Sequence, residues 1–403
     1  MQIQALQKFV NSLQDDIVTF LRDFIAIPSP SGREKEAADF LLAGMQELGF
    51  DEVWRDSTGS VAGRLGRGKT IILYDAHMDT VEAGDPAEWG FDPLKGKYEN
   101  GVVYGRGASD DKGCLTAMAF AGKVIKDLNL LGDFTLYVVG VVGEEIGEGL
   151  AIRNFLEETG IRPHYVVIGE ASDLRLCRGH RGRALLKVRV PGRAGHASAP
   201  ERADNALSKA AAIIREVERL PEKFASDPLL GKGSIAATKV DCKTPSLNTI
   251  PGECLLYLDR RLTVGETREL CLEQVREIAA PFGAEVEIMR CDEPGYMGRT
   301  IGGEEFFPAW SVPEDHPLIQ AGAEAFRRVL GREPVIGRWD FSTDGTYTAG
   351  VAGIPTLGFG PGSEEHPHTV RDQISVPQLL EALKVYAYLP NILAGESQGE
   401  EDR

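Results

Sequence analysis

Apolar residues recur along this chain with two different periods, and each period predicts a different kind of element. Near the N-terminus they follow helical spacing, and the residues that define the pattern are Leu6, Phe9, Val10, Leu13, Ile17, Phe20, Leu21 and Phe24. Acidic residues lie between them, so the pattern predicts an amphipathic helix and not a signal peptide. Four short apolar runs predict buried strands instead, at residues 69–76, 135–142, 165–168 and 354–359.

Polar residues follow the end of each predicted strand. These segments are His77-Met78-Asp79, Gly143-Glu144-Glu145, Gly169-Glu170 and, a few residues beyond the last strand, His366-Pro367-His368. Ligands of open α/β sheets bind outside the carboxyl ends of the strands, so we expect the four segments to meet at one crevice. The sequence therefore predicts a single site on an α/β domain.

The order of predicted elements changes between residues 181 and 290. Strands are predicted at 184–190, 234–240, 254–262 and 284–289, with helices at 203–220 and 267–282. This β-α-β-β-α-β order is that of a ferredoxin-like α+β unit, which is compact enough to be inserted into a larger domain. We therefore predict an α/β protein in which residues 1–180 and 291–403 form a catalytic domain, with a mixed sheet flanked by helices. Residues 181–290 form an inserted lid domain.

Composition excludes several classes of function. The chain has 403 residues, enough for two full cores, and a formal net charge of -17, which argues against nucleic acid or an anionic membrane as a partner. No apolar run reaches the ~18 residues of a membrane span. The six cysteines form no C-x-x-C pair, which argues against a zinc ribbon and predicts free thiols in a reducing cytoplasm.

The stretch from Gly105 to Gly113 places two consecutive carboxylates, Asp110 and Asp111, just before a predicted helix at residues 114–124. A glycine-bracketed turn can hold such an acid at the mouth of a site, where it could bridge two metal ions. The alternative is an acidic helix N-terminus favoured by the helix dipole.

The groups that converge at the strand ends have the chemistry of a metal centre. They are His77, His368, Asp110, Glu144, Glu145 and Glu170. Mixed imidazole and carboxylate ligands suit zinc, with cobalt or manganese as alternatives, and one shared carboxylate permits a two-metal site. The count fits His77, Asp110 and Glu170 on one metal, and His368, Asp110 and Glu145 on the other. Glu144 is then left as the general base for the attacking water.

Taken alone, each motif has a simpler explanation, because His-x-Asp is often a surface turn and Glu-Glu a solvated edge. Together they resemble the di-zinc metallopeptidase family that includes acetylornithine deacetylase, succinyl-diaminopimelate desuccinylase, aminoacylase and glutamate carboxypeptidase. The resemblance spans essentially the whole chain and is nearest to a peptidase branch linked to selenium metabolism. It implies a hydrolase whose fold belongs to the α/β class and which binds two divalent metal ions.

The resemblance also implies individual roles. Asp79 would orient His77, as a metal-bound imidazole requires. Asp110 would be the bridging acid, because it lies two residues before the lysine of the G-R-G-x-x-D-x-K-G pattern, and Asp111 would be an exposed neighbour. His368 would be the ligand rather than His366, because the following residues echo the family's H-x-x-N-E. Residues 371 and 372 depart from that pattern.

Motifs of the lid imply the remaining roles. Gly195-His196-Ala197-Ser198 is similar to the segment that reaches over the site of a neighbouring subunit, which implies a homodimer formed through the lid and an oxyanion-stabilising His196. Asn248, and Arg261 thirteen positions later, match the family's substrate-binding pattern. Arginine suits a two-point grip on a substrate carboxylate, although a surface salt bridge is the alternative. The loop at 342–345 implies a substrate contact for Thr343.

These features predict a cytoplasmic hydrolase that cleaves the amide bond of a short peptide or an N-acyl amino acid through a metal-activated water. A di-zinc aminopeptidase is an alternative, and it should recognise a free amine with an acid instead of a carboxylate with Arg261. A catalytically inactive, metal-stabilised binding protein is another, but it would have no need of Glu144.

Overall fold

The N-terminal amphipathic pattern forms two consecutive helices in the computed structural model, which describes residues 3–401. They are α1 (Ile3–Ser12) and α2 (Gln14–Ile25). Leu6 and Val10 of α1 are buried, as are Ile17 and Leu21 of α2, so the apolar stripe continues through the break. The pattern thus identified the buried face but not the interruption near Leu13.

The four predicted strand runs are neighbours in a nine-stranded sheet within the described residues. They are β3 (Thr70–His77), β6 (Phe134–Val141), β7 (Tyr165–Ile168) and β22 (Thr356–Gly358). Their order is β6-β3-β7-β22, and each neighbouring pair is parallel. Their carboxyl ends therefore meet at the same edge of the sheet, as predicted.

Antiparallel strands extend this sheet on both sides and make it mixed. Beside β6 lie β2 (Val61–Leu65) and then β1 (Glu52–Arg55). Beside β22 lie β8 (Leu176–His180) and then β20 (Trp310–Ser311). The strand β21 (Ile336–Trp339) also pairs with β8, but in parallel.

Helices flank both faces of the sheet. Gly140 lies against Leu41 of α3 (Lys35–Glu47) and Leu115 of α5 (Lys112–Asp127). Three positions earlier the strand presents its other face, where Tyr137 and Trp54 make an aromatic group with Phe155 of α6 (Leu150–Thr159). The helices α9 (Pro317–Leu330) and α11 (Val376–Glu401) pack against each other, and α11 also packs on α5. The predicted fold class, a mixed sheet flanked by helices, is confirmed.

The inserted segment has its own antiparallel sheet. Its elements are β9 (Gly182–Pro191), α7 (Ala206–Val217), β13 (Ser234–Asp241), β15 (Glu253–Leu262), α8 (Arg268–Ala279) and β16 (Glu285–Ile288). The strand order is β13-β15-β9-β16, with β19 (Phe306–Phe307) added beside β9. The first and third strands of the unit lie at the centre, which is the ferredoxin-like order.

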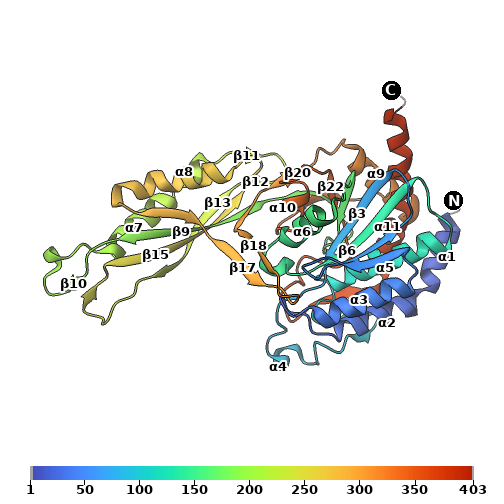
Figure 1. The fold of residues 1–403 in the computed structure, drawn as a ribbon, viewed down its shortest axis with the longest axis horizontal. Helices are drawn as coiled ribbons and strands as arrows, with labels where there is room; N and C mark the ends of the chain where they lie inside the picture. Colours follow the sequence, from blue (N-terminus) through green and yellow to red (C-terminus); the bar gives the residue numbers. More distant parts are fainter. Residues whose placement is uncertain (1–2, 402–403) are drawn as a thin grey trace.

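Two hydrophobic cores form in the described part of the chain. One contains the residues that pack on the nine-stranded sheet, and the other contains residues between Ala184 and Ile288. Figure 1 shows the second group as an elongated arm that extends away from the first, with both termini at the opposite end of the molecule. We propose that the cores correspond to the two predicted domains.

Short elements complete the structure. A small sheet contains β23 (Gln373–Ser375), β5 (Val102–Tyr104) and β4 (Lys97–Glu99). Two-stranded ladders pair β10 (Gly195–His196) with β14 (Thr249–Ile250) and β11 (Ser226–Asp227) with β12 (Gly231–Lys232). A third ladder pairs β17 (Arg290–Pro294) with β18 (Thr300–Glu304). The short helices are α4 (Pro86–Trp89), α10 (Gly345–Thr348), and the 3-10 turns η1 (Glu144–Ile146), η2 (Pro200–Arg202), η3 (Leu220–Lys223) and η4 (Ala280–Phe282).

The prediction that all cysteines are free is wrong for two of them. Cys242, just after β13, forms a disulfide with Cys254 of β15. Neighbouring antiparallel strands bring the two residues together across twelve positions of sequence, and their spacing gave no sign of it. None of the helices in residues 3–401 has the length and apolarity needed to cross a bilayer.

Candidate metal centre

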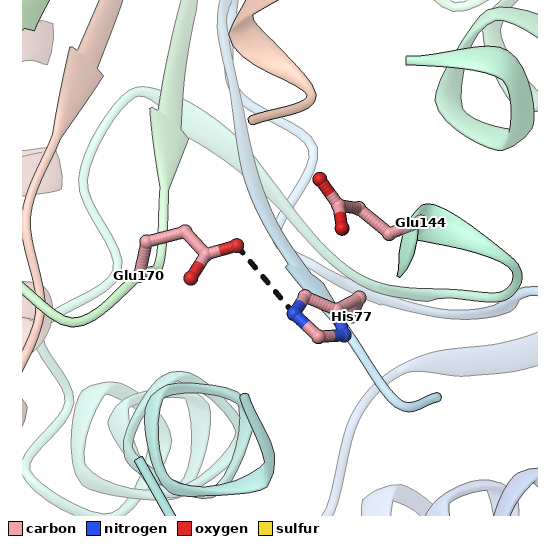
Figure 2. Close-up of side chains that lie close together, drawn as sticks. All are labelled: His77, Glu144 and Glu170. Carbon is pink, nitrogen blue, oxygen red and sulfur yellow. Dashed lines mark ion pairs between the residues drawn. The ribbon is translucent and has the colours of Figure 1, made fainter. Parts of the chain in front are cut away.

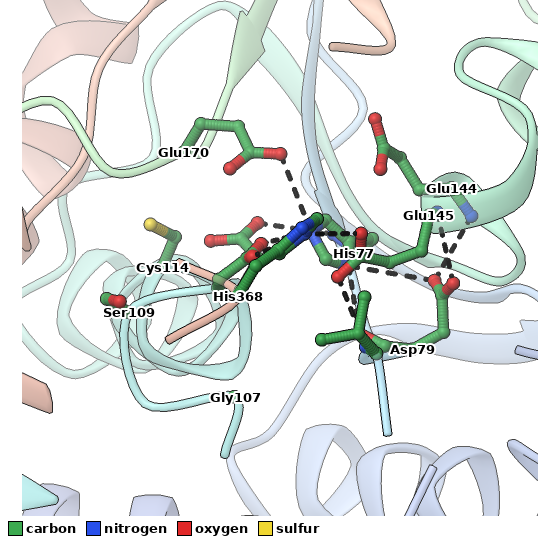
Figure 3. Close-up of polar contacts among 12 residues, drawn as sticks. His77, Asp79, Gly107, Ser109, Cys114, Glu144, Glu145, Glu170 and His368 are labelled. Carbon is green, nitrogen blue, oxygen red and sulfur yellow. Dashed lines mark hydrogen bonds and ion pairs between the residues drawn. The ribbon is translucent and has the colours of Figure 1, made fainter. Parts of the chain in front are cut away.

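His77 ends β3 and points toward the acids that follow the neighbouring strands. Its Nε2 lies 3.0 Å from Oδ1 of Asp110 and 3.5 Å from Oε1 of Glu170 (Figure 3). Its Nδ1 lies 2.9 Å from the main-chain oxygen of Asp79, which only an N–H can satisfy. This contact fixes the orientation of the ring, and a bound cation would take the place of a proton on Nε2.

Asp110 lies between the two histidines that the sequence selected. Its Oδ1 faces His77, and its Oδ2 lies 3.3 Å from Nε2 of His368. The same nitrogen of His368 lies 2.8 Å from Oε2 of Glu145. The two oxygens of one carboxylate thus face two different imidazoles, which is the arrangement that a bridging ligand requires.

Glu144 and Glu170 flank His77 in Figure 2. One ligand atom from each of these three residues lies within 4.8 Å of the others, and a second group of the same kind contains His77, Asp110 and Glu145. Oε1 of Glu144 is buried and has no hydrogen-bond partner. The donor set therefore fits two divalent cations, and Glu144 has an oxygen left over for water.

Burial and mutual repulsion perturb the acids of this cluster. Burial raises the pKa of Glu144 well above its usual range, and Glu170 shares this shift because it too is buried and lies near other carboxylates. Hydrogen bonds to Asp110 and Glu145 raise the pKa of His368 to about 10. Cations held among these groups would favour the charged carboxylates and the neutral imidazoles, as metal ligation requires.

Asp79 connects His77 with the segment that carries the glutamates. Its carboxylate accepts hydrogen bonds from the main-chain N–H groups of Glu144 and Glu145, each at 3.2 Å, and from Oγ of Ser31 at 2.6 Å. The Asp79 side chain lies 3.6 Å from Nδ1 of His77, whereas its main-chain oxygen lies at 2.9 Å. Asp79 therefore positions His77 through its main chain and the 144–145 segment through its carboxylate.

Asp372 is fully buried and joins the two loops that carry Asp110 and His368. Its carboxylate accepts hydrogen bonds from the N–H groups of Gly107 and Ser109, at 2.7 and 2.8 Å, and from Oγ of Ser109 at 2.8 Å. Nη1 of Arg106 adds an ion pair at 3.1 Å. Asp372, where the family pattern has a glutamate, therefore keeps a carboxylate, and this carboxylate braces the site.

The prediction that Asp111 is an exposed neighbour is wrong. Its side chain is fully buried, and Oδ2 accepts a hydrogen bond from the main-chain N–H of His77 at 3.3 Å. Burial raises the pKa of Asp111 well above its usual range. Two consecutive acids in a sequence do not reveal that one of them is buried against the end of β3.

A cavity of about 380 Å³ opens beside this cluster. Its lining residues are Asp110, Glu144, Glu145, Glu148, Glu170, Arg183, Arg261, Phe341, Ser342, Glu364, Pro367 and His368. Arg261 reaches the cavity from the inner end of β15, with Nε and Nη2 held by Asp259 at 2.8 and 3.1 Å. The fork of Arg261 is therefore displayed toward the space beside the metal ligands.

His196 and Asn248 lie together but outside this cavity. Nδ2 of Asn248 is 3.4 Å from Nε2 of His196. Both residues lie at the outer end of the lid, where Figure 1 shows β10. Arg261 lies far from Asn248, because β15 separates them and a strand of ten residues spans about 30 Å.

Thr343 is also placed differently from the prediction. It is fully buried, its Oγ1 lies 3.1 Å from Nε2 of His180, and its main-chain N–H donates to the same nitrogen at 3.1 Å. The side chain therefore holds its own loop, and the adjacent Ser342 lines the cavity instead. Burial lowers the pKa of His180 to about 4, which keeps the imidazole neutral.

Sequence reasoning missed several residues that shape this site. Arg183 lines the cavity directly across the β9–β15 ladder from Arg261, and its Nη2 lies 2.8 Å from Oε2 of Glu148. Arg183 of β9 is directly opposite Arg261 of β15, and opposed residues share a face of the sheet. Knowledge of the pairing between these two strands would therefore have identified Arg183 as a second arginine at the cavity. Ser31 and His180 carried no sequence signal, because their roles depend on contacts with distant segments.

Comparison with known proteins agrees with this geometry. Residues 73–391 match the profile of peptidase family M20/M25/M40. The chain is 39% identical over 379 residues to the uncharacterized protein YgeY of Escherichia coli K12, with 94% of each chain covered. It is 27% identical over 402 residues to succinyl-diaminopimelate desuccinylase of Gluconacetobacter diazotrophicus, which covers 94% of this chain and 97% of the relative.

A solved structure supports the fold. The dinuclear metal-binding peptidase YXEP of Bacillus subtilis superimposes with a TM-score of 0.70 at 16% identity, over 96% of this chain and 99% of that one. Since the family profile covers most of the sequence and YgeY is similar over nearly the whole length, this chain belongs to peptidase family M20/M25/M40 and is a metal-dependent hydrolase.

Proposed function

We propose that this hydrolase cleaves the amide bond of a short peptide or an N-acyl amino acid that carries a free carboxylate. The observation that carries the proposal is the position of Asp110, whose two oxygens lie 3.0 and 3.3 Å from the imidazoles of His77 and His368. A shared carboxylate between two mixed ligand sets, beside an open cavity, is suited to metal-assisted hydrolysis.

We assign the ligands as the sequence suggested. His77, Asp110 and Glu170 would hold one cation, and His368, Asp110 and Glu145 the other; we propose zinc, because imidazole and carboxylate ligands suit it, with cobalt or manganese as alternatives. The bound cations would lower the pKa of a water molecule and polarise the amide carbonyl.

Glu144 is the proposed general base. It is close to His77 and Glu170 but has an unpartnered buried oxygen, so it can accept a proton from the attacking water and return it to the leaving amine. Asp79 positions the segment that carries Glu144, because the Asp79 carboxylate accepts a hydrogen bond from the main-chain N–H of Glu144.

Arg261 is the proposed grip on the substrate carboxylate. It lines the cavity, and because Asp259 holds its Nε–Nη2 edge, a substrate carboxylate would bind the Nη1–Nη2 edge or displace Asp259. Two acids, Glu148 and Glu364, also line the cavity, as an aminopeptidase would need. Each is already paired with an arginine, at 2.8 and 3.2 Å, as Arg261 is with Asp259. The match of Arg261 to the family's substrate-binding pattern is therefore what favours carboxylate over amine recognition.

His196 and Asn248 lead us to propose a homodimer. They lie together at the end of the lid that is remote from their own cavity, so they could reach a substrate only in another subunit. There, His196 would donate a hydrogen bond to the developing oxyanion. Four cysteines are buried free thiols, and we propose a cytoplasmic location on that basis. The Cys242–Cys254 disulfide is the exception, and a disulfide in that compartment is usually transient and redox-sensing.

Glu144→Gln provides the test, because it keeps the shape of the side chain and removes its basicity. The variant should retain the metal content of the wild-type protein in elemental analysis, and kcat on a panel of dipeptides and N-acyl amino acids should fall by at least ~100-fold. Loss of one metal would show that Glu144 is a ligand. An unchanged kcat would exclude it as the base.

A further inference from the structure

We propose that the Cys242–Cys254 disulfide is a reducible site that sets the activity of the enzyme, by holding the loop that positions His196. The oxidised protein is the active form, and reduction lowers turnover. This inference rests on the proposed function, in which His196 serves a partner subunit's cavity. Its experimental test includes a measurement that is independent of substrate.

The disulfide closes the loop between two neighbouring strands of the lid. Cys242 follows the end of β13, and Cys254 is the second residue of β15. The intervening residues carry Asn248 and the short strand β14. The disulfide therefore defines both ends of the segment on which Asn248 is displayed.

Side-chain packing contributes little to holding this loop. Residues 243–248 are exposed, and Leu247 at the tip is fully exposed. Ile250 is the buried apolar residue of the segment. Ser246 hydrogen-bonds Asn248 and Thr249 within the loop, and the oxygens of Pro251 and Gly252 accept main-chain hydrogen bonds beyond it. The covalent ends and the ladder to β10 also hold the loop, so removing the cross-link increases its conformational freedom.

The ladder transmits the position of the loop to His196. His196 is paired with Thr249, and Gly195 with Ile250. The main-chain N–H of Ala197 donates to the oxygen of Asn248 at 2.9 Å, and the main-chain N–H of Ser198 donates to Nδ1 of His196 at 3.1 Å, which leaves the proton of a neutral ring on Nε2. These contacts fix the nitrogen that would face the substrate, so a loosened loop displaces a catalytic group.

Reduction would act selectively at this position. The other four cysteines are buried free thiols, so the disulfide is the one cross-link between cysteines in residues 3–401. Cys242 is half-buried and Cys254 fully buried. A dithiol reductant can therefore reach Sγ of Cys242 more readily than its partner.

A dithiol reduces the Cys242–Cys254 disulfide in two steps. A thiolate of the reductant attacks Sγ of Cys242, the disulfide breaks, and Cys254 leaves as a thiolate that takes up a proton. The second thiol of the reductant then displaces Cys242 and closes the reductant's own disulfide. The protein gains two electrons and two protons, and the reductant loses them.

The first measurement compares kcat before and after reduction with a phosphine, which consumes water and becomes the phosphine oxide. Misplacing a catalytic group by about 1 Å can cost up to ~100-fold, so we expect kcat to fall by about 10- to 100-fold and to recover on reoxidation. The double variant Cys242→Ser/Cys254→Ala should have the low kcat of the reduced enzyme and should not respond to the phosphine. Cys291→Ser, which alters a free thiol outside the lid core, should respond like wild type.

The second measurement is the rate of tryptic cleavage after Lys243, which is exposed at the start of the loop. Fragments are quantified by mass spectrometry after a common final reduction. Reduction before proteolysis should accelerate this cut several-fold, as expected for a local unfolding step made easier.

The outcomes separate this inference from the proposed function. Faster cleavage together with a lower kcat supports it, and an unchanged kcat despite faster cleavage overturns it. Unchanged cleavage overturns it whatever the activity. A phosphine response of the double variant equal to that of wild type also overturns it, because the reductant would then act elsewhere. If no substrate of the panel is hydrolysed by either form, the proposed function fails.

Discussion

Replacing Arg261 with alanine should change which end of a substrate the enzyme recognises. The guanidinium lines the cavity, and its Nε and Nη2 already hold the carboxylate of Asp259 at 2.8 and 3.1 Å, so the fork is oriented before any substrate binds. A charge-assisted pair of this kind contributes ~1.5–3 kcal/mol, which corresponds to about 10- to 150-fold in kcat/KM.

Competition with Asp259 determines where in that range the loss should fall. The Arg261 side chain is 41% exposed, and a substrate carboxylate must share or replace an existing partner. We therefore expect a loss near the lower end, about 10- to 30-fold, for Arg261→Ala. Arg261→Lys should retain part of the activity, because it keeps the charge but loses the two-point geometry.

The assay compares pairs of substrates that differ only in the carboxylate. Each N-acyl amino acid is measured beside its amide, and kcat/KM should fall for the acid and hardly change for the amide. Arg189→Ala is the matched control, because Arg189 is an exposed arginine of the lid whose partner, Glu253, lies 2.6 Å away and outside the cavity. Equal losses on acid and amide would refute the grip and favour the aminopeptidase alternative.

Three further experiments test other parts of the molecule. Mixing His196→Ala with Glu144→Ala subunits should restore part of the activity of mixed dimers, and no recovery after proven subunit exchange would refute action across subunits. Burial lowers the pKa of His180 from 6.5 to about 4, so its neutral form contributes stability that is complete above pH 6.5 and lost as the pH falls toward 4. By pH 5 the free energy of unfolding should have fallen by ~2 kcal/mol through this group. The variant His180→Gln should therefore show a weaker dependence of its denaturant midpoint on pH between pH 7 and 5. A dependence equal to that of the wild-type protein would contradict this prediction. Asp372→Ala should weaken metal retention about 10- to 100-fold in dialysis against a chelator, with a smaller loss for Asp372→Asn, and full retention would show that the brace is dispensable.

The strand ends of the catalytic domain could be predicted from the sequence because one rule connects them. β3, β7 and β22 are buried parallel strands with near-continuous apolar runs, and parallel strands deliver their carboxyl ends to the same edge. His77 and Glu170 therefore had to lie near each other once the runs were recognised. The ferredoxin-like order of the lid followed in the same way from its periodicity.

Other features depended on contacts that periodicity does not encode. The position of Asp111 behind β3 depends on how a loop packs beneath a strand, and the Cys242–Cys254 pair depends on strand register. Asn248 and Arg261 match one family pattern, but the length of β15 places them at opposite ends of the lid. An extended strand converts separation in sequence into separation in space, so a shared family pattern did not show that the two residues are far apart within one chain.

Because hydrogen bonds of Asp372 tie the Asp110 loop to the His368 segment, the spacing of the ligands is set when the chain folds and needs no cation. Cation uptake then orders few backbone groups, so the entropy lost on binding is confined to side chains and to the hydration shell of the ion. A template of this rigidity selects among divalent ions by how well their preferred geometry matches a fixed set of oxygens and nitrogens. One cation should therefore replace another without a rearrangement of the surrounding fold.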